Sequence, residues 1–570
     1  MIPSSLTPQS CLDTHTPALL TPSSGGPALC AASARATRLS RANPLLTLLS
    51  ILAAPAAALF IQTGSPDLSG NDSYYHVRMA EMLPSLGFVQ SFPWLHWTIF
   101  RDDFISHHHG FHVLLSPLVW LSKILTGSPI WGGKAVSVVG AALTAWLVHL
   151  VLGQRGTSHR WLWVLLILIL PWHFWLRQSF ARAPVIALPL LLGATLFMIK
   201  QRPLWMGLLG FIFTHVYGGV VLFPLVPAAF VAAAILTQSD LRRPLWCAVC
   251  ACIGLAAGLI VNPYFPGNFA FLKTQILDTG LGAPAEVGGE WKPFDAWFLF
   301  KMSAPLALVW AGALVRRLRC GERIDATGLA LLILNFGFLV LTIKARRFVE
   351  YWPVFALLDA AYLATTGTTG ADPYRRPWMD KPRLRLAAGS LAGIAILLVG
   401  AYNVGITRFH ARPGHDDAAL AGAMDYLNAN SPAGSLVLTD DWDIFPACFY
   451  HNTHNHYAVG LDPVFTSARY PELWERYRII TRGEAPDKVW FEPRSGPRQA
   501  TLKDIRSEFS ADYMLVARDH GKLYQQLMNE PAQFKRAWPP AATTSPQKER
   551  QPAYSVFRVV SPPANTLVGD

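Results

Sequence analysis

Residues 44–81 read PLLTLLSILAAPAAALFIQTGSPDLSGNDSYYHVRMAE, an apolar run followed at once by a polar one. Residues 44–62 carry no charged side chain, and an α-helix needs about 20 apolar residues to cross the hydrocarbon core of a bilayer. The polar part that follows contains Asp72, His76 and Arg78. The stretch therefore predicts a membrane span that opens into a polar loop at the membrane surface.

The composition of the whole chain agrees with this organisation. Charged residues make up 15% of the 570 residues and hydrophobic residues 52%, whereas a soluble domain has about 25% charged residues. These values exclude a disordered chain and an ordinary soluble enzyme. The 48 Lys and Arg outnumber the 36 Asp and Glu, and in so apolar a chain this excess indicates cytoplasmic loops rather than a nucleic-acid partner.

Apolar runs of the required length predict about eleven spans. They lie near residues 44–62, 131–153, 161–176, 183–199, 203–218, 219–237, 244–262, 294–315, 327–343, 348–366 and 386–405. A further run, 110–125, is short and contains His112 and Lys123, so it is either a twelfth span or a helix at the membrane interface. We prefer the interfacial helix, because it places the basic loops on one side, as the positive-inside rule requires.

Three parts of the chain differ in character. Residues 1–42 are rich in Ser, Thr, Pro and Ala and predict a disordered cytoplasmic leader. Residues 43–410 hold the spans and a large first outer loop at 63–130. Residues 411–570 alternate amphipathic helices with short strands, which predicts a soluble α/β domain on the outer face. The predicted fold is a polytopic α-helical membrane protein with a C-terminal extracytoplasmic α/β domain.

Two acidic stretches of the first outer loop are candidates for chemistry. Asp72 lies near the start of a predicted helix, where its carboxylate could take a proton from an acceptor hydroxyl or bind a divalent cation. The alternative is that Asp72 caps this helix. Asp102, Asp103 and His107 lie in RDDFISHHH, for which the alternative is a solvated loop.

Several basic residues on the predicted outer side break the charge rule. They are Arg177 and Arg182 in WLRQSFARAP, and Lys344, Arg346 and Arg347 in TIKARRFVEYW, which also contains Tyr351. Charges at a membrane boundary indicate function by default, and guanidinium groups match the oxygens of phosphate. A lipid-linked phosphate would explain these residues. The alternatives are snorkelling to lipid headgroups and pairing with Glu350.

Two further segments resemble a known family. NDSYYHVRMAEMLPSLG (71–87) is similar to the first-loop segment of the oligosaccharyltransferase catalytic subunits, within the GT-C superfamily of membrane glycosyltransferases. SLVLTDDWDIFPACFYHNTHNHYAVGLDP (435–463) lies where that group has its WWDYG motif, after a helix and a strand. The resemblance spans most of the chain and implies a GT-C fold and a polyprenyl-linked sugar donor.

The resemblance also assigns roles to residues. It implies that Asp72 is the catalytic acid of the first loop and that the outer basic residues contact a polyprenyl phosphate. Our candidates for substrate binding are Arg78, Asp102, Asp103, His107, Arg177, Arg182, Lys344, Arg346, Arg347, Tyr351, Trp442 and Asp443. The second acidic motif of the group should fall near QSFARAP, where this chain has Arg182 instead. A divalent cation, Mg²⁺ or Mn²⁺, therefore stays a possibility and its ligands are unassigned.

These observations favour a membrane glycosyltransferase that transfers a sugar or glycan from a polyprenyl-phosphate or pyrophosphate donor at the outer face, in a bacterial inner membrane. The expected partners are that donor, membrane lipids and a glycan, lipid or protein acceptor. One alternative is an oligosaccharyltransferase acting on protein, against which the sequence DWDIF in place of WWDYG argues. Others are a transporter or flippase of lipid-linked glycans, for which no internal repeat is visible, and a scaffold whose outer domain binds a partner.

Overall fold

The computed structural model describes residues 44–157, 159–275, 288–365, 381–492, 496–540 and 552–560. The chain forms two units, Met1–Pro44 and Leu45–Asp570, and the second is described below. The predicted leader 1–42 lies outside the described residues. So do Arg375 and Arg376, which belong to the basic loop between the spans predicted near 348–366 and 386–405. The predicted domain boundaries stay predictions.

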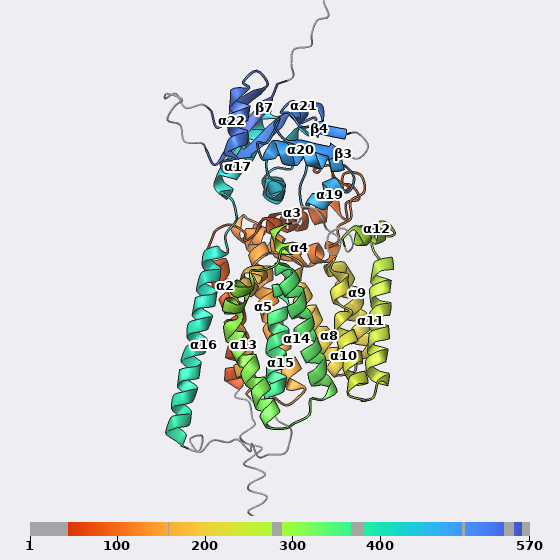
Figure 1. The fold of residues 1–570 in the computed structure, drawn as a ribbon, viewed down its shortest axis with the longest axis vertical. Coiled ribbons are helices and arrows are strands. Elements are labelled where there is room, and N and C mark those ends of the chain that lie inside the picture. The colour runs from red at the N-terminus through yellow and green to blue at the C-terminus, as the bar shows by residue number, and fades with distance from the viewer. Residues whose placement is uncertain are drawn as a thin grey trace, which may run out of the picture. The chain divides into compact units, whose positions relative to one another are not determined.

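All eleven predicted spans coincide with apolar helices, which confirms the polytopic helical fold (Figure 1). The helices are α2 (Pro44–Gln62), α5 (Ile130–Gly153), α6 (Arg160–Leu165) continued by η1 (Leu166–Ile169) and α7 (Trp172–Gln178), α8 (Pro184–Ile199), α9 (Pro203–Val216), η2 (Val220–Leu222) with α10 (Leu225–Leu236), α11 (Arg242–Ile260), α13 (Ala296–Arg319), α14 (Ala326–Lys344), η5 (Arg346–Glu350) with α15 (Trp352–Ala364), and α16 (Pro382–His410). Among the described residues, six of these helices are long and apolar enough to cross a membrane alone. Helical backbone satisfies its own hydrogen bonds, which the bilayer core demands.

One span is sharply bent, and the bend helps to position the candidate site. Arg160–Ile169 and Trp172–Gln178 meet at an angle of 88°. Pro171 lies at the break with extended backbone, and proline lacks the N–H that would continue the helical ladder. The bend turns α7, which carries Arg177, nearly perpendicular to α6 and η1.

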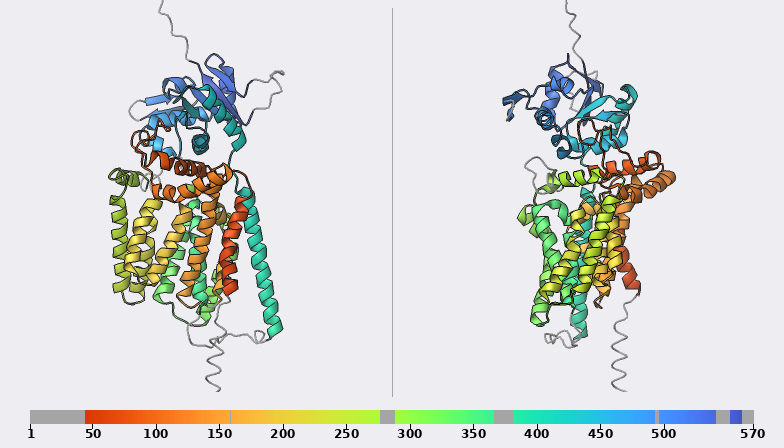
Figure 2. Two further views of the ribbon diagram at one scale, coloured as in Figure 1. Left: turned by 180° about the vertical axis from the view of Figure 1, so that it is seen from behind. Right: turned by 90° about the vertical axis from the view of Figure 1, so that its right-hand side faces the viewer.

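Two helices of the first loop lie across the ends of the spans rather than beside them: α3 (Asn71–Leu86) and α4 (His109–Thr126) (Figures 1 and 2). On α4, Phe111 and His112 are buried, whereas Ile124 and Leu125 are more than 70% exposed. An exposed apolar stripe on a helix in this orientation agrees with the interfacial helix predicted for residues 110–125.

The C-terminal region has the expected α/β pattern. Its helices are α17 (Asp417–Asn430), η7 (Trp442–Ile444), α18 (Phe445–His451), α19 (Pro463–Ser467), α20 (Pro471–Thr481), α21 (Asp504–Ser507) and α22 (Gly521–Asn529); its strands are β1 (Leu436–Thr439), β2 (His456–Tyr457), β3 (Val489–Glu492), β4 (Gly496–Gln499), β5 (Tyr513–Ala517), β6 (Phe534–Trp538) and β7 (Tyr554–Val559). Five strands form one sheet in the order β2-β1-β5-β7-β6, with β1 parallel to both β2 and β5. The sequence predicts strands at 435–439, 456–460, 513–517 and 554–559; β1, β5 and β7 match three of them, whereas β2 covers only the first two residues of 456–460.

The first loop and the C-terminal sheet form one continuous core. Backbone hydrogen bonds of 2.8–2.9 Å link Trp94, His96 and Trp97 to Tyr457 and Ala458, so the loop extends the sheet beyond β2. Two short helices, α12 (Gly267–Lys273) and η4 (Gly289–Trp291), lie in the loop between α11 and α13. These contacts bring the start of α3 and the segment after β1 together, although they are more than 350 residues apart in sequence.

Candidate functional site

The start of α3 is fixed by close packing against the loop between α7 and α8. Gly70 caps the helix with φ of +72°, and a Cβ atom there would stand 3.0 Å from the Phe180 ring. The Ser73 hydroxyl accepts a hydrogen bond of 2.9 Å from the Ala181 N–H. Asp72 therefore lies in the first turn, beside this loop, and Gly70 rather than Asp72 is the N-cap.

Asp72 faces a group of arginines that converge on one carboxylate. Nη1 of Arg182 lies 3.4 Å from Asp72 Oδ2 and 3.1 Å from Glu290 Oε2. Nη2 of Arg177 lies 2.7 Å from Glu290 Oε2, and Nη1 of Arg347 lies 3.2 Å from Glu290 Oε1. We call Arg177, Arg182 and Arg347 the arginine cluster. Both oxygens of Glu290 are thus occupied by guanidinium groups.

Two further contacts hold the arginine cluster in place. Arg177 also binds Glu350, at 2.5 Å, so the pairing considered from the sequence does occur. The guanidinium of Arg347 lies 4.2 Å from the ring centre of Trp291, a cation–π contact. The three arginine side chains are only 11–14% exposed. They are held rigidly, which suits recognition of an anion with fixed geometry.

The charges shift two carboxyl groups in opposite directions. Surrounding protein displaces water from Asp72 and raises its pKa, although Arg182 acts to lower it. Burial would likewise raise the pKa of Glu290, but the arginine cluster outweighs it and holds this pKa well below the usual value. Glu290 is therefore held in its ionised form, whereas the pKa of Asp72 is shifted in the direction that makes its carboxylate a stronger base.

The segment after β1 meets the start of α3 from the C-terminal side. Asn71 Nδ2 donates hydrogen bonds to the backbone O and the Oδ2 of Asp443, at 3.1 and 2.8 Å. Burial and the nearby charges of Asp72 and Asp441 raise the pKa of Asp443 to about 8. Its carboxyl group is therefore mainly protonated at neutral pH. The ring of Trp442 lies close to Gly288, two residues before Glu290.

A hydrogen-bonded chain supports Asn71 from α17 and α18. Asn71 Oδ1 lies 3.1 Å from His415 Nδ1, and the other ring nitrogen of His415 lies 3.1 Å from Asp417 Oδ1. The same oxygen of Asp417 lies 3.0 Å from His451 Nε2. Burial would raise the pKa of Asp417, but the two histidines hold it well below the usual value. The chain fixes the residue next to Asp72 from both sides.

The structure thus brings Asp72, Arg177, Arg182, Arg347 and Asp443 together, with Trp442 beside them. Tyr351 is buried next to Glu350 and packs on Phe338. His107 is close to this region, stacked on Phe271 with ring centres 4.8 Å apart. Burial, together with the nearby charge of Arg347, lowers the pKa of His107 to about 4.

The other predicted residues lie apart from the arginine cluster. Arg78 binds Glu81 at 2.8 Å. Asp102 and Asp103 are exposed, and Asp102 lies 3.4 Å from Arg469. Lys344 is exposed, and Arg346 donates to the backbone O of Pro293 rather than to Glu290. Their assignment to substrate binding stays a prediction.

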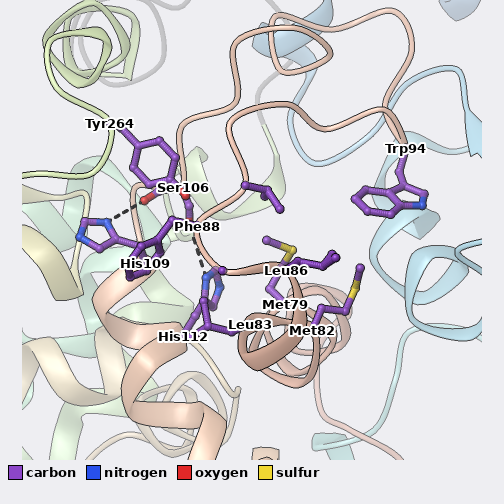
Figure 3. Close-up of a pocket in the computed structure, with 12 residues that line it drawn as sticks. Met79, Met82, Leu83, Leu86, Phe88, Trp94, Ser106, His109, His112 and Tyr264 are labelled. Atoms are coloured by element: carbon purple, nitrogen blue, oxygen red, sulfur yellow. Dashed lines mark hydrogen bonds between the residues drawn. The ribbon is translucent and has the colours of Figure 1, made fainter.

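A separate cavity lies beside the C-terminal half of α3 (Figure 3). Its walls are mainly apolar, with Met79, Met82 and Trp94 on one side and the polar groups His109, His112 and Tyr264 on the other. The Nδ1 of His76 lies 2.9 Å from His112 Nε2, behind this wall. Neither Asp72 nor the arginine cluster lines the cavity, so it does not explain their arrangement.

The residues around Asp72 do not fit a divalent cation. Three carboxylates lie there, those of Asp72, Glu290 and Glu350, and each already contacts at least one guanidinium within 3.4 Å. A metal ion placed among them would meet the positive charges of the arginine cluster at short range. In the described part of the chain, one group of side chains has the spacing of metal ligands, Asp440 with Asp519 and His520.

Sequence reasoning missed Glu290 and the chain Asn71–His415–Asp417. Glu290 follows the glycine-rich stretch that ends GG at 288–289, where no helical or strand period marks it. His415 gave no motif, because its partner Asn71 lies 344 residues away in the sequence. The signal that could have pointed to Glu290 is the excess of arginines on the outer side, since three buried guanidinium groups require acidic partners.

Comparisons with known proteins address the fold. No protein-family model matches the chain, and a search of curated protein sequences finds no match. One similar solved structure is the archaeal oligosaccharyltransferase AglB from Archaeoglobus fulgidus, in complex with an inhibitory peptide and a dolichol-phosphate. Its TM-score is 0.59 and its sequence identity 12%, and the match covers 84% of this chain and 70% of that one.

Two other solved structures are similar over most of this chain. ArnT from Cupriavidus metallidurans bound to undecaprenyl phosphate has a TM-score of 0.51 and 13% identity, and the match covers 90% of this chain and 98% of that one. The arabinofuranosyltransferase AftD from Mycobacteria has a TM-score of 0.52 and 13% identity, with 90% of this chain and 40% of that chain covered.

The chain therefore shares the fold of these solved structures, in agreement with the GT-C fold that the first-loop segment predicts. The similar structures include an oligosaccharyltransferase, an arabinofuranosyltransferase and ArnT, so the fold alone does not identify an acceptor.

Proposed function

We propose that the protein is a glycosyltransferase that moves a sugar or glycan from a polyprenyl-phosphate or pyrophosphate donor to an acceptor hydroxyl or amide. One observation carries the proposal: three nearly buried arginines converge on a single carboxylate, and one of them also contacts Asp72 at 3.4 Å. A carboxylate and a phosphate present similar oxygens to guanidinium groups. Glu290 thus marks the place that the donor phosphate would take.

The proposed reaction is a direct displacement. Asp72 takes the proton of the acceptor, whose freed electron pair attacks the anomeric carbon of the donor. The bond between that carbon and the phosphate oxygen breaks, and the phosphate leaves with an added negative charge. The arginine cluster stabilises this charge where it develops. The raised pKa of Asp72 supports its role, because a higher pKa makes the ionised carboxylate a stronger base.

Similar solved structures agree with this chemistry. AglB is described with a dolichol-phosphate and ArnT with undecaprenyl phosphate, so both hold a lipid phosphate in the same fold. We infer that this chain lies in a bacterial inner membrane, and the distribution of its basic loops supports a C-terminal sheet on the periplasmic side. The donor would then enter from the bilayer, and membrane lipids would surround α16, whose apolar side chains are largely exposed.

A second candidate is an oligosaccharyltransferase with a protein acceptor. The observation in its favour is the position of Trp442 and Asp443, which lie beside Asn71 and Gly288 at the edge of the arginine cluster. Mainly neutral at pH 7, the Asp443 carboxyl could donate a hydrogen bond to an acceptor group. Mass spectrometry of glycans and glycoproteins from a deletion strain would separate protein acceptors from glycan or lipid acceptors.

The substitution D72N tests the reaction itself. A general base contributes roughly 10²- to 10⁴-fold to rate, so glycan product from membranes should fall by about that factor. The D72N variant should still bind undecaprenyl phosphate, because its arginine cluster is intact. Native mass spectrometry of the detergent-solubilised protein would measure this binding. Normal product formation by D72N would overturn the enzymatic role of Asp72 and favour a transporter or scaffold.

A further inference from the structure

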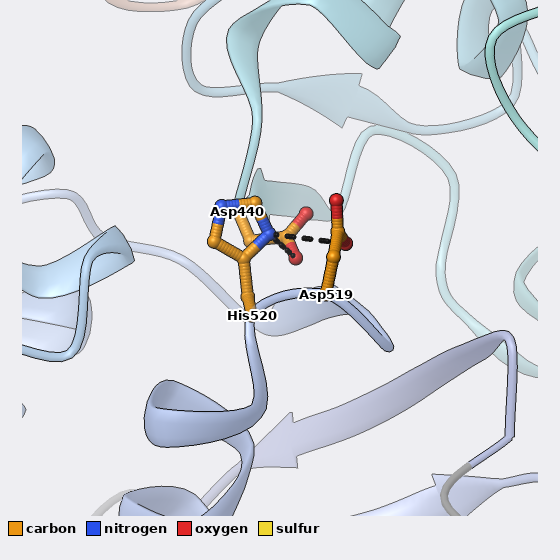
Figure 4. Close-up of side chains that lie close together, drawn as sticks. All are labelled: Asp440, Asp519 and His520. Carbon is orange, nitrogen blue, oxygen red and sulfur yellow. Dashed lines mark ion pairs between the residues drawn. The ribbon is translucent and has the colours of Figure 1, made fainter.

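Three side chains meet at one edge of the C-terminal sheet, away from the arginine cluster. Asp440 directly follows β1, and Asp519 and His520 follow β5. These strands are neighbours and parallel, with Thr439 opposite Leu515, so their carboxyl ends open on the same edge. Figure 4 shows the two carboxylates facing the imidazole ring. Such an edge is where ligands bind in many sheets of this type.

The distances have the scale of a metal site. The Nδ1 of His520 lies 2.8 Å from Asp440 Oδ2 and 3.6 Å from Asp519 Oδ1, and one ligand atom from each residue lies within 4.8 Å of the others. Ligands about 2.0–2.2 Å from a tetrahedral Zn²⁺ stand roughly 3.3–3.6 Å apart. Small side-chain movements would therefore bring all three onto one ion.

One buried oxygen of the group has no partner without an ion. The Asp440 side chain is 1% exposed, and its Oδ2 accepts a hydrogen bond of 2.6 Å from the Ala517 N–H. Among the described residues, Asp440 Oδ1 has no hydrogen-bond partner, whereas His520 Nδ1 forms an ion pair with Asp440 Oδ2 at 2.8 Å. A buried carboxylate oxygen without a partner is costly, and a cation between it and the imidazole would remove that cost.

We propose that Asp440, Asp519 and His520 bind one divalent transition-metal ion of the Zn²⁺ or Mn²⁺ class. An imidazole, which gives up its proton when it binds a metal ion, and two carboxylates suit these ions better than Ca²⁺ or Mg²⁺, which prefer oxygen ligands alone. Three protein ligands leave at least one position for water. The ion fixes the start of the segment Asp440–Phe445, which carries Asp443 to Asn71, and so stabilises the junction between the sheet and α3. This site does not depend on the proposed transfer reaction.

Metal binding by the full-length protein in detergent tests the proposal without any sugar substrate. After removal of metal with a chelator, titration with Co²⁺ should give one saturable site with the visible absorption of a low-coordinate ion, and Zn²⁺ should displace it. The variants D519N and H520A should weaken binding at least tenfold and abolish the rise in melting temperature that Zn²⁺ causes. D519N is informative even if H520A folds poorly, because the Asp519 side chain is 82% exposed.

The matched control is D425N, which removes an exposed carboxylate of α17 in the same domain. It should bind Co²⁺ as the unaltered protein does. Equal Co²⁺ stoichiometry, affinity and spectrum in D519N, H520A and the unaltered protein would overturn the proposal, as would the absence of a saturable site. The group would then be a buried ion pair between His520 and Asp440.

Discussion

Nη1 of Arg182 lies 3.4 Å from Asp72 Oδ2, so a member of the arginine cluster directly contacts the proposed base. The same nitrogen lies 3.1 Å from Glu290. Arg182 therefore contacts both Asp72, the proposed base, and Glu290, which marks the expected position of the donor phosphate. Its positive charge also favours the ionised form of Asp72, against the effect of burial.

The substitution R182Q should move the acid limb of the pH–rate profile to higher pH. Burial already raises the pKa of Asp72, and without the Arg182 charge this pKa rises further. Since Asp72 acts as a base only when ionised, more alkaline conditions are then needed for the same rate. The rate of glycan transfer measured from pH 5 to pH 9 checks this. R182K keeps a charge at the position, and its profile should move less; identical profiles for R182Q and the unaltered protein would contradict the contact.

Replacement of Arg347 should weaken binding of undecaprenyl phosphate more than replacement of its neighbour Arg346. Arg347 contacts Glu290, whereas Arg346 is exposed and donates to Pro293. A hydrogen bond to a charged group contributes about 1.5–3 kcal/mol, so R347A should raise the dissociation constant roughly 10- to 100-fold. Titration of the solubilised variants would measure it. If R346A had the larger effect, the phosphate would lie outside the arginine cluster.

The raised pKa of Asp443 predicts how stability depends on pH. Its usual value is 3.8, and in the folded protein it is about 8. Between these values the folded chain keeps a proton that the unfolded chain has lost, so this group favours folding less as pH rises. Asn cannot ionise and still accepts the hydrogen bond from Asn71. The melting temperature of D443N relative to the unaltered protein should therefore increase from pH 5 to pH 8. A difference independent of pH would show that Asp443 is ionised throughout.

Much of the fold could be predicted from the sequence, because its signals are local. A run of about 20 apolar residues has few alternatives to a membrane helix, and the strands 436–439 and 513–517 are short apolar runs between turn residues. Strand β6 was missed, since FKRAW is half polar and only its pairing with β7 makes it a strand. Pairing between distant segments leaves no period in the sequence.

The candidate site was predictable in part for the same reason. Arg177, Arg182 and Arg347 stood out because their charge conflicts with the membrane topology, which is a property of the sequence itself. Glu290 did not, because its role arises only when a loop after α12 meets the ends of α7 and η5. Arg346 and Arg347 were equivalent in sequence, and only the direction of η5 separates them: one contacts Pro293 and the other Glu290.

The glycines at the two ends of α3 allow the effect of backbone strain to be measured separately from the effect of a steric clash with Phe180. Gly70 and Gly87 both have positive φ, +72° and +63°, and a side chain at such positions costs about 1–3 kcal/mol. A Cβ at Gly70 would also press on the Phe180 ring at 3.0 Å, whereas at Gly87 nothing lies within 4 Å. G70A should therefore lower the melting temperature more than G87A. It should also reduce the rate of transfer, because any shift of α3 away from Phe180 moves Asp72 away from Arg182. G87A, the matched control, should lose stability with little loss of rate per folded molecule. Equal rates for the two folded variants would mean that the contact of α3 with Phe180 does not position the base.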